Sequence, residues 1–330
     1  MSAGHQPSPG GEGGKAGTPW TRGRALASLA VLVAGLLVFH DAVPNAVGNL
    51  GSLLETFLPW VGLAVPLLAV LALLRRSALA AVALLLPMTV WVALFGDRLP
   101  PAERGVASDL TVSRLTVLQH NVADDNPDPA GTARVLAAAG ADLVALEELT
   151  PEALPVYGAA LAPDHPHRAV VGTVGLWSRY PLTDSRPVDI RPKDIEGDWN
   201  RGLRTTARTP YGDVAVYVAH LPSLRVRLPD GFGSGRRDES AVALGAALAA
   251  ERLERVVLLG DLNGTLDDRG LAPLTSRLIP AREGFDFSWP VAFPVARIDH
   301  VMTRAVTPVS TWTLPATGSD HLPVMARVRL

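Results

Sequence analysis

The residues best suited to chemistry in this chain stand where short apolar runs end. In the stretch VVLLGDLNG, residues 256–264, four apolar residues are followed by Gly260, Asp261 and Asn263. The apolar run predicts a buried strand, and Gly260 allows the chain to turn sharply at its end. Asp261 and Asn263 are two residues apart, so in extended backbone they face the same side. A carboxylate beside an amide suits a metal-bound water and a phosphoryl oxygen, although a strand followed by an Asx turn explains this stretch equally well.

Other predicted strands in residues 113–330 also end in polar side chains. The polar residues at these ends are Asn121, Glu147, Glu148, His220, Asp299, Asp320 and His321. Neighbouring residues on a strand face opposite ways, so only one of Glu147 and Glu148 can point into a site shared with Asn121. Solvated strand ends are common, and each residue alone is a weak indication. Together they would supply the parts of a Mg²⁺-assisted phosphoryl-transfer site.

Arginines are concentrated in a predicted hairpin over residues 201–221 and in the loop that follows it. These arginines are Arg201, Arg204, Arg225, Arg227, Arg236 and Arg237. Such a loop is usually just solvated, but the planar guanidinium group also binds phosphate through paired hydrogen bonds. We predict that Arg201, Arg204, Arg236 and Arg237 bind an anionic substrate.

The first 105 residues predict a membrane region. Residues 1–24 are rich in Gly, Pro and Ser and predict a disordered cytoplasmic tail. Uncharged apolar runs follow at residues 25–39, 57–74 and 78–95, of which the last two hold 18 residues each. That length is close to the ~20 residues needed to cross a bilayer. The first run has 15 residues, spans only if it continues past Asp41, and has the arrangement of a secretory signal peptide as an alternative.

Basic residues predict the orientation of the three spans over residues 25–96. Basic residues of the tail precede the first span, and Arg75 and Arg76 separate the second from the third. The loop between the first two spans has no Lys or Arg. The positive-inside rule therefore places the N-terminus in the cytoplasm and everything after the third span outside. Residues 97–112 are expected to be a linker, which makes this a multi-pass protein of the plasma membrane with an extracytoplasmic domain.

Charge and cysteine content lower or exclude several classes of protein. The chain has no Cys, which excludes a disulfide framework and a thiolate metal site. Residues 106–330 hold 23 basic against 27 acidic residues, a net charge of −4. Domains that grip a nucleic-acid backbone are usually basic, so nucleic acid is an unexpected partner.

The order of these motifs is similar to that of the endonuclease/exonuclease/phosphatase (DNase I-like) family of metal-dependent phosphoesterases. The resemblance covers residues 113–330 and rests on Asn121, LEE at 146–148, LWSR at 176–179, HL at 220–221, GDLN at 260–263, RID at 297–299 and SDHLP at 319–323. It implies an α+β fold, a two-sheet β-sandwich flanked by helices, here preceded by an α-helical membrane region of three spans.

The resemblance also implies a metal site. Glu148 resembles the principal Mg²⁺ ligand, with Asn121 and Asp320 near the metal, and Mn²⁺ is an alternative ion. Glu147 departs from the pattern, because many members of the family have Gln there. An extra acid at this position either changes metal affinity or faces away.

Catalytic roles are implied in the same way. Asp261 and Asn263 resemble the residues that orient the attacking water and bind the phosphoryl group. His321 resembles the catalytic histidine, held by the acid Asp299. His220 resembles a second histidine that stabilises or protonates a phosphate oxygen.

The family resemblance leaves the substrate open, because one fold carries many activities. A compact, acidic domain tethered outside a membrane resembles in layout the membrane-anchored glycopeptide-resistance proteins of the VanJ type. That resemblance implies hydrolysis of a lipid-linked diphosphate, undecaprenyl pyrophosphate, with the bilayer itself as a partner. The alternatives are an extracytoplasmic nuclease or phospholipid phosphodiesterase and, from a different class, a non-catalytic membrane sensor.

Overall fold

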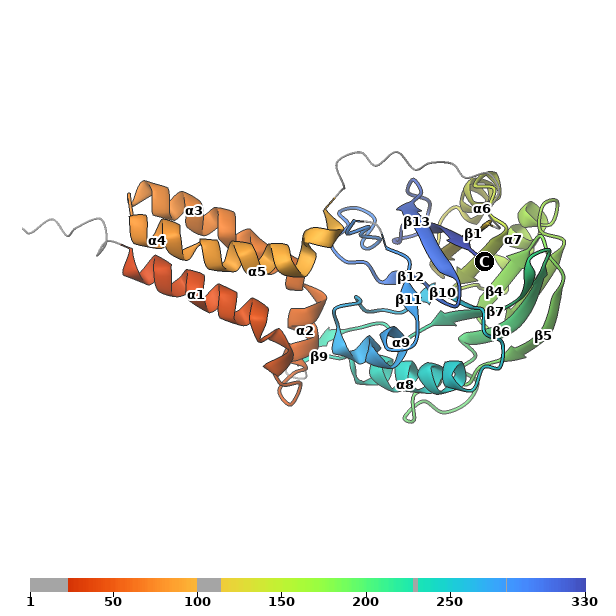
Figure 1. The fold of residues 1–330 in the computed structure, drawn as a ribbon. Coiled ribbons are helices and arrows are strands. Elements are labelled where there is room, and N and C mark those ends of the chain that lie inside the picture. Colours follow the sequence, from red (N-terminus) through yellow and green to blue (C-terminus); the bar gives the residue numbers. More distant parts are fainter. Residues whose placement is uncertain (1–22, 100–113, 228–230, 283) are drawn as a thin grey trace, which may run out of the picture. The chain divides into compact units, whose positions relative to one another are not determined.

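The computed structural model describes residues 23–99, 114–227, 231–282 and 284–330. Most of the predicted tail and linker, at residues 1–22 and 100–112, therefore lies outside the described residues. The chain forms two compact units, and Figure 1 shows the elements of each. The first comprises the described residues up to Phe39 together with Pro59–Leu94, and the second comprises His40–Leu58 and Phe95–Leu330.

The first unit is helical and has a core of small and branched apolar residues. Its elements are α1 (Arg24–Val38), the 3-10 turn that begins at Leu58 and continues to Leu63, α3 (Ala64–Leu74), α4 (Ala78–Ala83) and α5 (Leu85–Phe95). Ala30, Ala72 and Ala80 are buried where the helices meet. In contrast, Leu73 and Leu74 are 74% and 76% exposed. Small residues inside and leucines outside are the pattern of helices that pack within a bilayer.

The three predicted membrane spans are not confirmed. Among the described residues, one helix, Ala78–Arg98, is long and apolar enough to cross a membrane. Leu50–Thr56 and Leu58–Leu74 meet the same criteria only as a pair bent by 70°. The helix Arg24–Val38 is apolar but has only 15 residues. A span count of three is therefore a proposal.

The second unit contains two six-stranded mixed sheets. The first sheet has the order β13 (Thr307–Thr313), β14 (Val324–Arg329), β1 (Arg114–Asn121), β2 (Leu143–Glu147), β4 (Val174–Ser178), β3 (His167–Val171). The second has the order β11 (Ile279–Pro280), β12 (Asp299–Arg304), β10 (Val256–Asp261), β7 (Gly212–His220), β6 (Gly202–Thr209), β5 (Leu182–Pro187). A small hairpin, β8 (Val226–Arg227) and β9 (Gly231–Phe232), stands apart from both.

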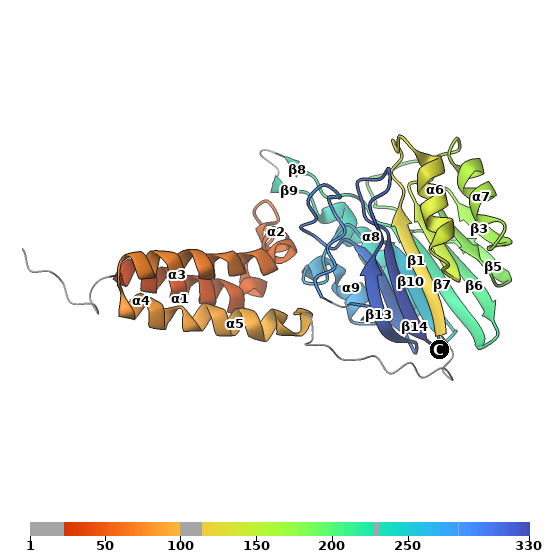
Figure 2. The same cartoon turned by 90° about the horizontal axis from the view of Figure 1, so that it is seen from above.

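Helices cover the outer faces of the two sheets, as Figures 1 and 2 show. Helices α6 (Pro129–Ala138) and α7 (Leu154–Leu161) pack on the first sheet. Helix α8 (Gly235–Ala249), the 3-10 turn Arg269–Leu271 and α9 (Ala272–Thr275) pack on the second. The short elements His40–Ala42, α2 (Leu50–Thr56) and Gly96–Arg98 complete the unit. The predicted sandwich flanked by helices is confirmed.

Alternation along the strands builds the core of the sandwich. In β10, Val257 and Leu259 face the first sheet, whereas Val256 and Leu258 face α8. Because successive strand residues point to opposite faces, a strand buried on both sides needs a continuous apolar run. This is why residues 256–259 show no polar alternation.

Strand direction brings the polar strand ends to one edge. Strands β1 and β2 are parallel, and Asn121 is in register with Glu147. Strands β7 and β10 are also parallel, with Asp261 in register with His220. Strand β12 is antiparallel to β10 and begins at Asp299, opposite Asp261. The ends of five strands from both sheets therefore meet at this edge.

Candidate active site

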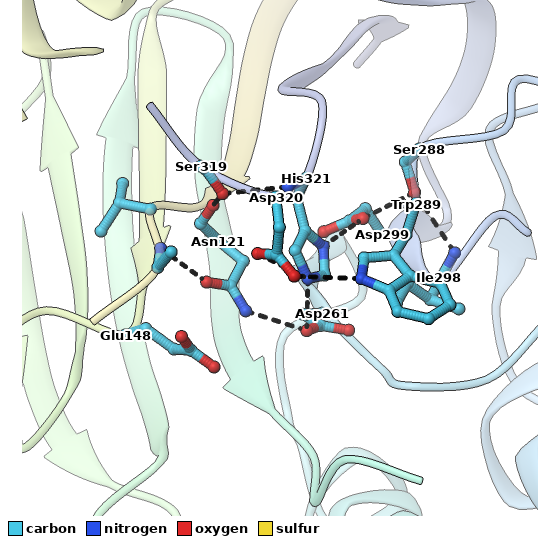
Figure 3. A network of polar contacts seen from close by, with 12 residues as sticks. Asn121, Glu148, Asp261, Ser288, Trp289, Ile298, Asp299, Ser319, Asp320 and His321 are labelled. Atoms are coloured by element: carbon cyan, nitrogen blue, oxygen red, sulfur yellow. Dashed lines mark hydrogen bonds and ion pairs between the residues drawn. The ribbon is translucent and has the colours of Figure 1, made fainter. Parts of the chain in front are cut away.

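An ion pair between Asp299 and His321 lies at the centre of the cluster (Figure 3). Oδ2 of Asp299 lies 2.8 Å from Nδ1 of His321. Ser288 donates to the same carboxylate oxygen at 2.6 Å, and Gln119 donates to the other at 3.0 Å. Burial alone would lower the pKa of His321, but the carboxylates of Asp299 and Asp261 raise it to about 10. Burial opposes ionisation of Asp299 too, yet His321 holds the pKa of that carboxyl at about 2.

Asp261 and two amide side chains form a second part of the cluster. Asn121 donates to Oδ2 of Asp261 at 3.0 Å, and Asn263 donates to the same oxygen at 3.2 Å. The backbone amide of Asn263 donates to Oδ1 at 2.9 Å. Asn263 has φ of 46°, a left-handed conformation that Asn tolerates better than most residues. Burial and the nearby Asp299 raise the pKa of Asp261 to about 7, against the lowering effect of His321.

His220 is buried beside two carboxylates, and its ring orientation is set by Arg201. Nη1 of Arg201 donates to Nδ1 of His220 at 3.4 Å, which leaves the ring proton on Nε2. Nε2 lies 3.5 Å from Glu148 and 3.8 Å from Asp261, with no hydrogen-bond partner in the described parts of the chain. Burial and the positive charges of Arg201 and His321 lower the pKa of His220 to about 3, so the ring is neutral.

Glu147 is the last residue of β2 and Glu148 follows it, and both have partners among the residues near the cluster. Glu148 adopts φ of 57°, so the strict alternation of an extended strand does not apply to this pair. The carboxyl of Glu147 is fully buried and accepts from Gln119 at 2.9 Å. Burial and Asp299 raise the pKa of Glu147 well above its ordinary value. Glu148 remains partly exposed and accepts from the amide of Asp124 at 3.2 Å.

Two of the four predicted substrate-binding arginines are buried and paired with acids of the protein. Arg204 pairs with Glu251 at 2.9 Å and is 4% exposed, away from the catalytic edge. The side chain of Arg237 is fully buried and pairs with Asp268 at 2.6 Å. In both cases a neighbouring acid neutralises the buried guanidinium, which opposes the predicted binding of an external anion.

The other two predicted arginines line a cleft next to the cluster. The cleft has a volume of about 450 Å³, and its lining includes Arg201, Arg225, Arg236, Trp199 and Ile195. The guanidinium of Arg201 stacks over the Trp199 ring at 5.0 Å. Arg236 pairs with Asp194 at 2.9 Å on the rim, where both side chains are 59% exposed.

The donor atoms of the cluster fit a hard divalent cation. Asp261, Asp299 and His321 offer three potential ligand atoms within 4.8 Å of one another. Asp299 and His321 form an ion pair with each other, however, and the positive charge of the protonated His321 ring repels a metal cation. The carboxylates of Glu148, which is partly exposed, and Asp320, which is exposed, lie around the amide of Asn121 (Figure 3) and are the kind of oxygen ligands that Mg²⁺ takes together with water.

Several polar residues in the network have no role predicted from the sequence, although Ser319 stands in the SDHLP motif. Ser319 donates to the carbonyl of Asn121 at 2.7 Å and accepts from the His321 amide, which fixes the loop that carries His321. Trp289 donates to Asp320 at 3.1 Å. Ser288 and Trp289 lie in an irregular stretch without periodicity, so no sequence pattern could have identified them.

The sequence model of the "Endonuclease/Exonuclease/phosphatase family" matches residues 118–321, more than half of the chain. The chain belongs to the endonuclease/exonuclease/phosphatase family. Members of this family are generally hydrolases of phosphoesters and usually use divalent metals. The match begins within β1 and ends at His321, so it includes every strand end that contributes to the cluster.

Solved structures of low sequence identity share the fold. Sphingomyelinase C from Streptomyces griseocarneus is 22% identical in sequence, with a TM-score of 0.51. The alignment covers 66% of this chain and 99% of the sphingomyelinase chain. D. rerio TDP2 complexed with single-strand DNA product is 18% identical with a TM-score of 0.55, covering 66% and 100%. An endonuclease/exonuclease/phosphatase from Bacteroides vulgatus is 17% identical with a TM-score of 0.55, covering 66% and 99%. No curated protein matches the chain in sequence.

Proposed function

We propose that this chain is a membrane-anchored, metal-dependent phosphoesterase that hydrolyses a lipid-linked diphosphate outside the plasma membrane. Undecaprenyl pyrophosphate is the substrate that we favour, and Mg²⁺ is the favoured ion. A role in glycopeptide resistance rests on the resemblance in layout alone. The observation that carries the proposal is the arginine-lined cleft beside His220, in a chain that also contains an apolar helical unit.

The two histidines would act on the phosphoryl group in different protonation states. His321, a cation held by Asp299, stabilises negative charge on phosphoryl oxygens. His220 is neutral and directs its Nε2 proton into the site, where it can donate to another phosphoryl oxygen. Two hydrogen-bond donors held in fixed positions, one from each histidine, would stabilise the negative charge that develops on the phosphoryl oxygens during transfer.

Asp261 is the residue best placed to orient and deprotonate the attacking water. Its pKa of about 7 is near the value at which a general base is most effective. Asn121 and Asn263 fix the carboxylate by donating to one of its oxygens. A divalent cation held by Glu148, Asp320 and the nearby Asn121 would supply Lewis-acid polarisation of the phosphoryl group.

The cleft supports a diphosphate with an apolar tail. Arg201, Arg225 and Arg236 supply positive charge for a second phosphate next to the reacting one. Trp199 and Ile195 supply apolar surface in the same cleft, which suits the first carbons of a lipid chain. A volume of about 450 Å³ holds a headgroup and not a whole polyprenyl chain, so the remaining chain would stay in the bilayer.

The helical unit supports the membrane anchor. Gly23, at the start of α1, lies against Ser77, so the N-terminal end of α1 is next to the Arg75–Arg76 turn. In the sequence, the chain passes between this unit and the second unit after Phe39, before Pro59 and after Leu94. Basic residues at the start of α1 and in the Arg75–Arg76 turn, on the same side of the helical unit, agree with a cytoplasmic N-terminus and an extracytoplasmic active site.

A nuclease is the second candidate, favoured by the stacked Arg201–Trp199 pair. An aromatic ring beside a cationic group is a common platform for an unpaired base. The acidic net charge of residues 106–330 opposes this candidate. A non-catalytic sensor would not need the closely bonded set of Asp261, Asp299 and His321.

A paired substrate assay tests the proposed function. The purified full-length chain is given polyprenyl diphosphate in detergent and, separately, plasmid DNA, each with and without Mg²⁺. We expect Mg²⁺-dependent phosphate release from the diphosphate and intact plasmid. Rapid cleavage of DNA without phosphate release from the lipid would establish the nuclease instead.

A further inference from the structure

Residues 40–58 join two apolar helices in the sequence, yet they belong to the catalytic unit. The chain leaves the first unit after Phe39 and returns to it at Pro59. Between these points α2 lies beside β9 and the 3-10 turn Arg269–Leu271 (Figure 2). Besides a hydrogen bond from Arg269 to the carbonyl of His40, the segment contacts the rest of the unit at Glu55–Thr56 and at Gly48–Asn49.

The first contact is an ion pair between Glu55 and Arg269. Nη2 of Arg269 lies 2.7 Å from Oε1 of Glu55, and Nε of the same side chain lies 2.9 Å from Oε2. The backbone amide of Arg269 also donates to Oε2 at 2.9 Å. The side chain of Glu55 is only 2% exposed. Three donors on one buried carboxylate fix the position of Arg269 and of the backbone around it.

Asp268, the residue before Arg269, links the segment to the loop that contains Asn263. Asp268 accepts from Thr56 at 3.4 Å and from Arg237 at 2.6 Å, and its carboxylate is fully buried. Arg237 in turn donates to the backbone carbonyl of Asn263 at 3.2 Å. Gly264 leaves the space that Arg237 fills, because a Cβ there would overlap Nη1 of Arg237. Hydrogen bonds thus run from Thr56 through Asp268 and Arg237 to the backbone of Asn263, and Glu55 joins this set through Arg269, the residue next to Asp268 in the chain.

The same loop receives a second ion pair from the other membrane-proximal segment. Arg98 is the last residue of the apolar helix Ala78–Arg98 and donates to both carboxylate oxygens of Asp267, at 2.7 and 2.6 Å. Asp267, Asp268 and Arg269 are consecutive in the chain. Each of them forms an ion pair with a residue of the same unit, namely Arg98, Arg237 and Glu55 in that order. The loop that follows Asn263 is therefore held from two distant places in the sequence.

The second contact of residues 40–58 supports a wall of the cleft. The amide of Phe232 donates to the carbonyl of Gly48 at 2.8 Å, and Nδ2 of Asn49 donates to the carbonyl of Phe232 at 2.6 Å. Gly231 and Gly233, on either side of Phe232, line the cleft. A Cβ on Gly231 would overlap the backbone of Gly48, so the two segments approach as closely as backbone allows.

We propose that residues 40–58 position the active site: Glu55 fixes Asn263 through Arg269, Asp268 and Arg237, and Asn49 fixes the cleft wall through Phe232. This inference rests on the proposed function, since it assigns the segment a part in the same reaction. A buried ion pair is weak support for stability by itself, because apolar residues of similar volume often stabilise as well. The role that we assign to the Glu55–Arg269 pair is instead to hold the backbone at Asn263 in position, through Asp268 and Arg237.

The two contacts predict different kinetic effects in the full-length protein. Glu55→Gln keeps the shape and removes the charge, so kcat should fall roughly 10- to 100-fold with little change in KM, because a small misplacement of a catalytic group is costly. Asn49→Gly removes the donor and tolerates the φ of 51° at this position. It should raise KM for polyprenyl diphosphate several-fold and leave kcat near that of the wild type. General destabilisation would not separate the two parameters in this way.

Asp97→Asn is the matched control, because it breaks an exposed ion pair with Arg282 in the same unit. Backbone amide exchange of residues 261–268 gives a second measurement that needs no substrate, and it should accelerate in Glu55→Gln and not in Asp97→Asn. Wild-type kcat and wild-type exchange in Glu55→Gln would overturn the inference, as would equal losses in the control. If the wild-type chain hydrolyses no phosphoester, the proposed function fails, and the exchange measurement alone decides the inference.

Discussion

At His321, burial and charge act in opposite directions, and charge prevails. The ring is almost completely buried, which alone would favour the neutral form, yet Asp299 and Asp261 raise its pKa to about 10. Because folding raises this pKa from 6.5, the stabilising contribution of the ion pair is fully present below pH 6.5. The contribution declines as the pH rises toward 10. His321 is therefore an imidazolium throughout the neutral range.

Asp299→Asn should lower the pKa of His321. The substitution removes the nearest carboxylate, and burial, which favours neutral imidazole, then has more weight. An NMR titration of the His321 ring in metal-free protein measures this change directly. Stability of the variant relative to wild type should also fall most below pH 6.5. An unchanged ring pKa would mean that Asp261 or Asp320, and not Asp299, holds the proton on His321.

Residues with a family motif could be predicted from the sequence, and their supporting partners could not. Asn121, Asp261 and His321 stand at strand ends or in short motifs, and the structure brings them together. Arg236 and Arg237 are adjacent in the same sequence context, yet one is exposed and the other is fully buried. That difference depends on Asp268, 31 residues away from Arg237, which no local pattern reveals.

At the level of elements, the predictable features were those with strong periodicity. The apolar run of β10 and the alternating valines of β7 correctly predict strands, and the parallel pairing of β7 and β10 places Asp261 next to His220. Residues 40–58 show the opposite case. Their sequence, with several polar residues and no Lys or Arg, predicts only a loop between spans. Their membership of the catalytic unit depends on ion pairs and backbone bonds to residues about 180 to 215 positions later.

For the whole molecule, the sandwich follows from the sequence more securely than the membrane region does. The sandwich requires strands that are buried on both faces, and continuous apolar runs in the sequence indicate such strands. A count of spans depends on helix length and breaks, and in the part of the chain that the structure describes one helix satisfies the criteria alone while others are short or bent. Orientation depends on a few arginines. The arrangement with the catalytic unit outside therefore needs its own measurement.

Protease treatment of intact cells tests this orientation. With three spans and a cytoplasmic N-terminus, a protease added outside should digest the catalytic unit, and an N-terminal tag should remain protected. Permeabilised cells, in which both regions become accessible, serve as the control. Full protection of the catalytic unit in intact cells would reverse the orientation.

The central claim is that the strand-end cluster is a metal-dependent phosphoesterase site. Its most direct test is phosphate release from polyprenyl diphosphate by wild type, Glu148→Ala and His321→Ala, each across a Mg²⁺ titration. We predict Mg²⁺-dependent release by wild type and a loss of roughly 10²- to 10⁴-fold in each variant, the range typical for removing one acid–base or metal-binding group. Wild-type rates in both variants, with unchanged Mg²⁺ dependence, would contradict the account.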